Sequence, residues 1–343
     1  MQGLMTDKPL LISSLIDYAS RYHGNTEIVS CNTDGSIERS NYELVNLRSK
    51  KLAQSLINLG IRKGDTIGTM AWSNVRHYEL YYGVSGIGAI CHTINPRLFP
   101  EQISFIANDA KDKFLFLDAE FLPLLENLKE DLKNVEKFIV LCAKKDMPES
   151  EVIKDLICYE DILQNEDGNF SWPSFDEKTA SSLCYTSGTT GNPKGVLYAH
   201  RSTVIHSLAA ASADAMCISA RDVIMPVAPM FHANAWGIPY IANMVGAKLV
   251  LPGRHLDGES VYNILDKEEV TFTAAVPTIW LMLFEYLDKK NKKLKFLKRC
   301  VIGGSACPKF MIEDFHKKYE VEVIHAWGMT ETSPLGTVNK PLR

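Results

Sequence analysis

The chain contains 343 residues, of which 46% are hydrophobic and 23% are charged. This composition excludes collagen-like, mucin-like and disordered proteins, and the length suits about two domains or one large α/β unit. Thirty-seven Lys and Arg residues against 41 Asp and Glu residues give a net charge of −4, so we expect no nucleic-acid partner.

The eight cysteines lie far apart, with no C-x-x-C pair and no histidine at the spacing of a zinc site. This usage predicts reduced, mostly buried thiols and a cytoplasmic location. The N-terminus offers no small-residue cleavage site, so we expect no secretory signal.

The first half of the chain alternates helical patterns with short hydrophobic runs. Apolar residues at helical spacing predict helices over 10–22, 44–59 and 78–89. Buried strands are predicted over 66–70, after a turn, and over 114–117 and 137–141. The polar segment 165–178 then predicts a loop between two α/β halves.

The second half continues the alternation. Helices are predicted over 196–211, near 258–267 and from Pro277 onward, and strands over 248–251 and 272–275. The chain stops at 340–343 without a signal for a closing helix or strand, so we expect a frayed edge over 335–343. The alternation as a whole predicts an α/β fold with largely parallel sheets.

One segment, 223–247, lacks Asp, Glu, Lys and Arg over 25 residues and is long enough to cross a bilayer. Pro226, Pro229 and Pro239 would break such a helix repeatedly. We therefore expect a buried strand, a loop and a helix here, and no transmembrane segment.

The densest cluster of glycine and hydroxyl residues is S-S-L-C-Y-T-S-G-T-T-G-N-P-K-G at 181–195. Its glycines allow consecutive backbone N–H groups to surround an anion, and Lys194 adds a positive charge. This pattern predicts a phosphate cradle, with a flexible linker as the alternative. The nucleotide-hydrolysing P-loop is excluded, because Pro193 precedes Lys194 and Gly195 follows it. The expected hydroxyl donors are Thr186, Ser187, Thr189 and Thr190.

With this motif, the sequence resembles the adenylate-forming acyl-CoA synthetases along its whole length. Three further motifs stand in the order of that family: P-M-F-H-A-N-A-W-G at 229–237, G-G-S-A at 303–306 and W-G-M-T-E-T at 327–332. The resemblance implies the large N-terminal domain of such an enzyme, built as two αβαβα-type subdomains packed together. Their approximate extents would be 1–75 with 200–343, and 76–199.

The resemblance also implies which residues bind the nucleotide. Trp327 would stack on adenine, with a buried core Trp as the alternative, and 303–306 would form the opposite wall. The implied nucleotide-binding residues are Thr186, Ser187, Gly188, Thr189, Thr190, Gly191, Lys194, Gly303, Gly304, Ser305, Ala306, Trp327, Gly328, Met329 and Thr330.

Catalytic and substrate roles follow from the same resemblance. Glu331 would hold Mg²⁺ and Thr330 would donate to the α-phosphate, with a helix-capping Thr-Glu pair as the alternative. His232 would lie near the bound carboxylate, although a lone histidine among apolar residues is more often a core residue. Trp236 would line or gate the acyl pocket. The implied catalytic residues are Thr186, Lys194, His232, Thr330 and Glu331, and the substrate-binding residues are His232 and Trp236.

The implied activity is that of an AMP-forming acyl-CoA ligase. ATP would activate a medium- to long-chain fatty acid to an acyl-adenylate, and coenzyme A would then form the thioester. A short thioether acid, loading of a carrier protein, and a non-catalytic nucleotide- or acyl-binding protein are alternatives. The expected partners are the carboxylic acid and coenzyme A, with a homodimer as a possible assembly.

Members of the family typically continue beyond the point where this sequence stops. We find no segment for a ribose-binding acid, no hinge and no small C-terminal domain with an assisting lysine. The chain is therefore expected to be truncated and inactive in the overall reaction.

Overall fold

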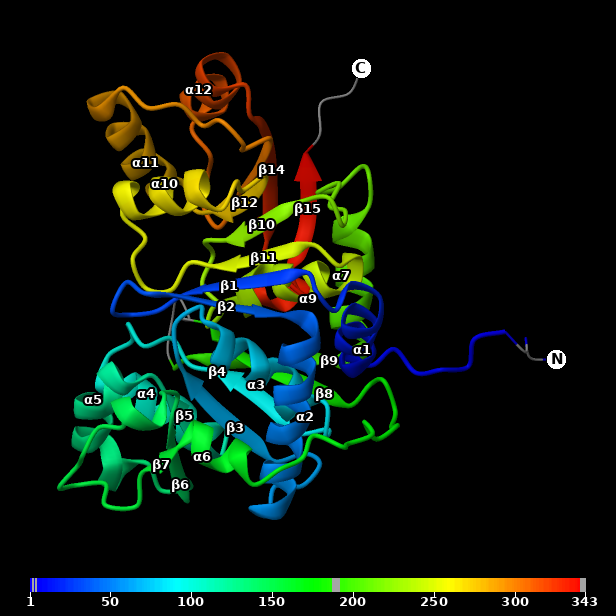
Figure 1. The fold of residues 1–343 in the computed structure, drawn as a ribbon, viewed down its shortest axis with the longest axis vertical. Helices are drawn as coiled ribbons and strands as arrows, with labels where there is room; N and C mark the ends of the chain where they lie inside the picture. Colours follow the sequence, from blue (N-terminus) through cyan, green and yellow to red (C-terminus); the bar gives the residue numbers. More distant parts are fainter. Residues whose placement is uncertain (2, 4, 187–191, 340–343) are drawn as a thin grey trace.

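The computed structural model describes residues 1, 3, 5–186 and 192–339, and its strands form two sheets (Figure 1). The strands of the first sheet are β1 (Glu27–Cys31), β2 (Ile37–Asn41), β10 (Val223–Pro226), β11 (Lys248–Leu251), β12 (Phe272–Ala275), β13 (Arg299–Ile302), β14 (Glu322–Gly328) and β15 (Leu335–Asn339). Their order is β15-β14-β13-β12-β10-β11-β1-β2. Pairing is parallel except at the two edges, where β2 and β15 run antiparallel to their neighbours.

The second sheet lies below the first in Figure 1. Its strands are β3 (Thr66–Met70), β4 (Ile90–Thr93), β5 (Asp112–Leu117), β6 (Lys137–Val140), β7 (Ile157–Cys158), β8 (Ala180–Thr186) and β9 (Lys194–Ala199). Their order is β7-β6-β5-β3-β4-β8-β9. Within the described part of this second sheet, β8 and β9 pair antiparallel and the other neighbours pair parallel. The predicted α/β class with largely parallel sheets is confirmed.

Helices follow most of the parallel strands along the chain. They are α1 (Ile12–His23), α2 (Tyr42–Asn58), α3 (Val75–Ser85), α4 (Pro100–Asp109), α5 (Leu122–Leu128), α6 (Tyr159–Gln164), α7 (His200–Ala211), α8 (Ala233–Trp236), α9 (Ile238–Val245), α10 (Gly258–Lys267), α11 (Pro277–Lys290) and α12 (Lys309–Tyr319). Short 3₁₀ segments are η1 (Ala119–Phe121), η2 (Lys129–Asp131), η3 (Lys144–Asp146) and η4 (Thr330–Thr332).

Local sequence explains where several helices begin. The side chains of Asn41, Asn74 and Asp257 accept hydrogen bonds from backbone N–H groups in the first turns of α2, α3 and α10. Pro277 starts α11 at a position where its missing N–H costs nothing. On α1, Ile12, Leu15, Ile16 and Ala19 form the buried face that the helical spacing predicts.

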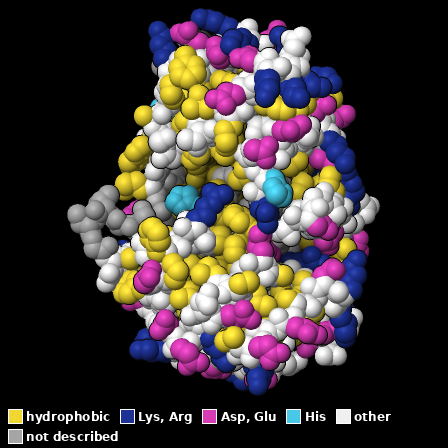
Figure 2. Space-filling model, turned by 90° about the vertical axis from the view of Figure 1, so that its left-hand side faces the viewer, with side chains coloured by type: hydrophobic (Ala, Val, Ile, Leu, Met, Phe, Trp, Pro, Cys, Tyr) yellow, Lys and Arg dark blue, Asp and Glu magenta, His cyan; other side chains and the backbone are white. Residues whose placement is uncertain are grey.

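A continuous core joins the two sheets. It contains residues from both, including Ile28 and Leu249 of the first sheet and Ile67 and Phe114 of the second. Between them, α3 supplies fully buried tyrosines whose hydroxyl groups satisfy backbone carbonyls across the junction. Tyr81 donates to Met230 O at 2.5 Å and Tyr78 to Pro239 O at 3.2 Å. Beside this junction, one face is hollowed and hydrophobic, with His, Lys and Arg side chains nearby (Figure 2).

Most predicted elements are confirmed within a few residues. The strands over 248–251 and 272–275 and the helix over 258–267 have the predicted bounds. The segment 223–247 forms β10, α8 and α9, and no helix in the described part of the chain is long and apolar enough to span a membrane.

Two predictions for the second half are wrong. The helix predicted over 196–211 begins at His200, because residues 194–199 form β9 and pair with β8 from Thr186↔Lys194 to Ala180↔Ala199. A frayed edge was expected over 335–343, but Leu335–Asn339 form β15, which finds hydrogen-bond partners along β14. Residues 340–343 lie outside the described residues.

The division into subdomains at residues 75 and 199 stays a prediction. The strand β3, which lies before residue 75, pairs with β4 and β5 of the second sheet. The end of the second sheet at Ala199 coincides with the predicted second boundary.

Candidate functional site

Three of the four motifs follow parallel strands of the first sheet. The segment 229–237 follows β10, 303–306 follows β13, and 327–332 includes the end of β14. The carboxyl ends of parallel strands lie at one edge of a sheet, where ligands of open α/β folds commonly bind. The sheet therefore brings together motifs that lie up to about a hundred residues apart in the sequence.

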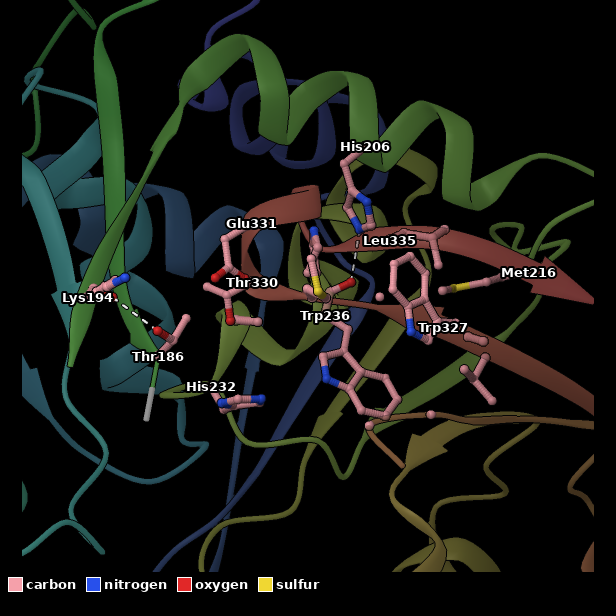
Figure 3. A pocket seen from close by; sticks show the side chains of 18 residues that line it. Thr186, Lys194, His206, Met216, His232, Trp236, Trp327, Thr330, Glu331 and Leu335 are labelled. Carbon is pink, nitrogen blue, oxygen red and sulfur yellow. Dashed lines mark hydrogen bonds between the residues drawn. The ribbon is translucent and has the colours of Figure 1, made fainter. Parts of the chain in front are cut away.

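These motifs line a cavity of about 540 Å³ (Figure 3). Figure 3 places Lys194, Thr186, Thr330, Glu331 and His232 on one side and Trp236, Trp327 and Met216 on the other. The cavity thus has a polar and an apolar end. Its lining consists of Thr186, Lys194, His206, Met216, His232, Ala233, Trp236, Val301, Gly303, Gly304, Ala326, Trp327, Gly328, Met329, Thr330, Glu331, Pro334 and Leu335.

The predicted phosphate cradle reaches the cavity from the second sheet. Thr186 ends β8 and Lys194 begins β9, and the two residues lie opposite each other in the antiparallel ladder. Thr186 Oγ1 lies 3.5 Å from Lys194 O. The tip of the predicted cradle, Ser187, Gly188, Thr189, Thr190 and Gly191, lies outside the described residues.

The segment η4 positions Thr330 and Glu331. Tyr198 of β9 donates its hydroxyl hydrogen to Thr330 O at 2.6 Å, and this bond is buried. Thr332 Oγ1 accepts from Met329 N at 2.9 Å and lies 2.5 Å from Pro334 O. Thr330 is buried, whereas the Glu331 side chain is exposed to the cavity. The turn therefore presents a carboxylate beside the end of β9.

The side chains around Glu331 fit a cation that is coordinated by few protein ligands. No group of three His, Cys, Asp or Glu side chains in the described ranges could hold a metal ion. Mg²⁺ typically takes one or two protein carboxylates and completes its octahedron with substrate phosphates and water. A single carboxylate at the polar end of the cavity suits that mode.

His232 lines the cavity and is exposed. Its side chain retains contact with solvent, yet the surrounding protein desolvates the ring and lowers its pKa. The ring is therefore largely neutral at pH 7 and offers one donor and one acceptor nitrogen.

Trp236 and the Gly303-Gly304 pair form the wall at the apolar end. A Cβ on Gly303 would lie 3.0 Å from Ala326 O and 3.5 Å from Cη2 of Trp236, and one on Gly304 would lie 2.9 Å from Val276 Cγ1. Larger residues would therefore crowd Ala326 and Val276 first, while the indole ring lies at van der Waals distance from both positions. Ser305 and Ala306 are exposed and do not line the cavity.

Trp327 is 55% exposed and covers the outer part of the cavity. The alternative of a buried core Trp is wrong for this position. A Cβ on Gly336 would lie 2.5 Å from the Trp327 ring, so the backbone of β15 packs directly against it.

Several lining residues were not singled out from the sequence, although they lie within segments expected to shape the acyl pocket, 204–232 and 301–329. His206, Met216, Val301 and Ala326 lie on α7, on the loop after it and within two strands. Their residue types are those of ordinary core positions, so only the fold reveals them. Ala233 lies within the second motif, and Pro334 and Leu335 follow the last motif after Ser333.

An α/β fold with a cavity at the carboxyl ends of parallel strands defines a broad class of small-molecule-binding proteins. The sequence profile of the AMP-binding enzyme family matches residues 16–343, and the chain belongs to this family.

The similarity to individual relatives extends along the whole chain. This chain is 53% identical to the 3-methylmercaptopropionyl-CoA ligase of Ruegeria lacuscaerulensis, in an alignment that covers 100% of this chain and 63% of the relative. It is 52% identical to the medium-chain-fatty-acid–CoA ligase of Ectopseudomonas oleovorans, covering 100% and 62%. The chain thus spans about three-fifths of the length of these curated relatives.

The structure is similar to that of the anthranilate CoA ligase AuaEII in complex with anthranoyl-AMP. The TM-score is 0.87 at 23% identity, covering 98% of this chain and 63% of that one. At this identity the likeness shows the fold alone. It agrees with the prediction of the large α/β part of an adenylate-forming enzyme.

Proposed function

We propose that the complete protein is an AMP-forming acyl-CoA ligase that activates a medium- to long-chain fatty acid. ATP and the acid would give an acyl-adenylate and pyrophosphate, and coenzyme A would then give the thioester and AMP. The proposal rests on one observation. A single cavity joins a polar end with Lys194, Thr330 and Glu331 to an apolar end with Trp236 and Met216.

The first step needs positive charge and hydrogen-bond donors. A carboxylate oxygen of the acid attacks the α-phosphorus, a new P–O bond forms, and the bond to the bridging oxygen breaks as pyrophosphate leaves. Both reactants are anions, so fixed donors must offset their repulsion. Lys194 and the hydroxyls of Thr186 and Thr330 are the described groups suited to this role.

Glu331 would hold Mg²⁺, which supplies charge neutralisation on phosphate oxygens when bound. Trp327, at the outer part of the cavity, offers an exposed ring face for adenine. Gly303 and Gly304 would border the nucleotide on the other side.

The acid would enter with its carboxylate toward the polar end. His232, neutral at pH 7, would donate to the carboxylate without a full charge. The chain of the acid would lie against Trp236 and the apolar wall to which the buried residues Val301 and Met216 belong.

A short thioether acid is the second candidate substrate. The observation that favours it is the similar identity to a 3-methylmercaptopropionyl-CoA ligase and to a medium-chain ligase, 53% and 52%.

The cysteines, all free, support a cytoplasmic location. A homodimer stays a prediction.

The test is an assay of the complete protein with ATP, Mg²⁺, coenzyme A and a panel of acids. The panel holds hexanoate, octanoate, decanoate, palmitate and 3-(methylthio)propionate. We expect AMP and pyrophosphate as products, with the highest rates for the medium-chain acids. ADP as the product, or no turnover with any acid, would contradict the proposed function. A preference for the thioether acid would select the second candidate.

A further inference from the structure

The segment that carries Trp236 has an unusual backbone. Ala233, Asn234, Ala235 and Trp236 all have positive φ, at 44°, 53°, 51° and 55°. Residues with a Cβ rarely adopt this left-handed conformation, and they do so only where surrounding structure holds it. The indole ring of Trp236 thus projects into the cavity from a turn that needs external support.

One support acts on the first half of the turn. Asn234 is buried, and its Oδ1 accepts from Cys184 Sγ at 2.9 Å while its Nδ2 donates to Tyr240 OH at 3.3 Å. Cys184 belongs to β8, two residues before Thr186. This contact therefore ties the turn to the strand that leads into the predicted phosphate cradle.

The second support acts on Trp236 itself. His206 of α7 places Nε2 2.9 Å from Trp236 O. A carbonyl oxygen only accepts, so Nε2 carries the hydrogen. His206 is 8% exposed, and burial lowers its pKa although the bond to Trp236 O opposes this, so the ring is neutral at pH 7 with its hydrogen on Nε2.

The imidazole is also fixed by close packing. Gly237, with φ +74°, lies so near that a Cβ on it would be 2.4 Å from His206 Cδ2 and Nε2. His206 therefore cannot approach Trp236 O in this way if any larger residue follows Trp236. The ring also lines the cavity directly.

We propose that His206 is a positioning residue that fixes the left-handed turn at Trp236 and thereby sets which acid chain lengths the cavity accepts. This inference rests on the proposed function. The bond to Trp236 O holds the backbone from which the indole ring meets Gly303 and Gly304. Without the bond, the turn can relax toward ordinary dihedrals and the ring can move, so the apolar end of the cavity changes shape. The polar end, with Lys194, does not depend on this bond.

The test follows Trp236 directly by ¹⁹F NMR of the chain labelled with 5-fluorotryptophan. The chain has five tryptophans, and loss of one signal in Trp236→Phe assigns the resonance. His206→Leu removes the donor, and His206→Gln restores an N–H group of similar reach. His200→Leu is the matched control, because His200 lies on the same helix but accepts from Ile12 N at 3.1 Å.

We expect His206→Leu to shift or broaden the Trp236 signal, and His206→Gln to return it toward the wild-type position. Titration with hexanoate and decanoate in the presence of AMP measures the acid preference. The ratio of the two dissociation constants should change about tenfold in His206→Leu, while the dissociation constant of AMP changes less than about twofold. His200→Leu should leave the Trp236 signal and the acid ratio as in the wild type.

An unchanged Trp236 signal in His206→Leu, the same change in His200→Leu, or no recovery in His206→Gln would overturn the role of His206. An altered Trp236 signal with an unchanged acid ratio would overturn its role in selectivity. If the complete wild-type protein activates no acid, the proposed function fails, and the NMR signals still decide whether His206 fixes the turn.

Discussion

Glu331 offers an exposed carboxylate to the polar end of the cavity, next to the buried Thr330. Glu331→Gln keeps the shape of the side chain and removes the charge that would hold Mg²⁺. We expect pyrophosphate exchange in the complete protein to fall about a hundredfold or more, since a metal ligand supplies several kcal/mol of transition-state stabilisation. The free energy of unfolding should change by less than about 0.5 kcal/mol, as for other exposed positions.

The matched control is Glu313→Gln on α12, which removes an exposed carboxylate that pairs with Lys317 at 3.2 Å. Its exchange rate should equal that of the wild type. Near-normal exchange and unchanged Mg²⁺ dependence in Glu331→Gln would show that this carboxylate does not bind the metal.

His77 predicts a pH dependence of stability. It is fully buried, with Nε2 3.0 Å from Thr69 Oγ1 and Nδ1 3.0 Å from Trp72 O, and burial lowers its pKa from 6.5 to about 4. As the pH falls, His77 is therefore protonated near pH 6.5 in the unfolded chain but only near pH 4 in the folded chain. The contribution of His77 to stability is complete above pH 6.5 and is lost as the pH falls toward 4.

We therefore expect the wild type to lose about 2 kcal/mol more than His77→Gln between pH 7 and pH 5. Chemical denaturation at both pH values measures this difference. His200→Gln should behave in the same way, since burial also lowers the pKa of His200 to about 4. A difference between variant and wild type that stays constant with pH would refute the assignment.

At the scale of elements, β9 and η4 meet through one hydrogen bond. Tyr198 OH donates to Thr330 O at 2.6 Å in a buried position. Tyr198→Phe leaves this carbonyl without its donor, which costs about 1–3 kcal/mol of unfolding free energy. The loss also frees η4 to move relative to Lys194 at the start of β9. We expect weaker ATP binding, measured by calorimetry.

The control for this prediction is Tyr286→Phe, whose hydroxyl lies 3.4 Å from Glu259 at an exposed position. It should change neither stability nor ATP binding appreciably. Unaltered ATP affinity in Tyr198→Phe would mean that η4 keeps its place without this bond.

Sequence patterns predicted the amphipathic helices, in which buried residues recur at helical spacing, and the strands whose residues are all buried. The buried strand over 272–275 and the amphipathic helix over 258–267 have the predicted bounds. The strand β9 was missed because only one of its six residues is buried, and its pairing with β8 determines its structure. The apolar residues at 196–198, just before α7, fit the pattern of a helix as well as that of a strand. An exposed edge strand carries little periodic signal.

The residues of the candidate site that belong to the four sequence motifs could be predicted. Thr186, Lys194, His232, Trp236, Thr330 and Glu331 all line the cavity. The support of the site was not predictable, because the left-handed turn before Gly237 depends on His206, about 30 residues earlier in the chain. Such tertiary contacts leave no local pattern, and a lone His on α7 is indistinguishable from a core residue in sequence.

At the scale of the whole molecule, a network of charges joins the two sheets. Arg48 of α2 contacts buried Glu79 of α3 at 2.6 Å and Glu160 of α6 at 2.9 Å. Arg76 of α3 connects Glu160, at 2.9 Å, to Glu38 of β2, at 3.3 Å. The network thus runs from the edge of the first sheet to helices that pack on the second. Burial raises the pKa of Glu79, and Arg48 opposes this rise.

Arg48 is the group whose loss should weaken this junction most. Arg48→Met leaves buried Glu79 with Tyr159 OH, at 2.6 Å, as its remaining side-chain partner among the described residues. Removing one partner of a buried pair costs about 3–5 kcal/mol. Adding Glu79→Gln should recover part of the loss, with a coupling energy of about 0.5–3 kcal/mol in the double-mutant cycle. Lys317→Met, which breaks the exposed pair with Glu313, should cost less than about 0.5 kcal/mol. Equal costs for Arg48→Met and Lys317→Met in urea denaturation, or strict additivity in the cycle, would mean that the two sheets are held together by their shared apolar core and tyrosines without help from the charges.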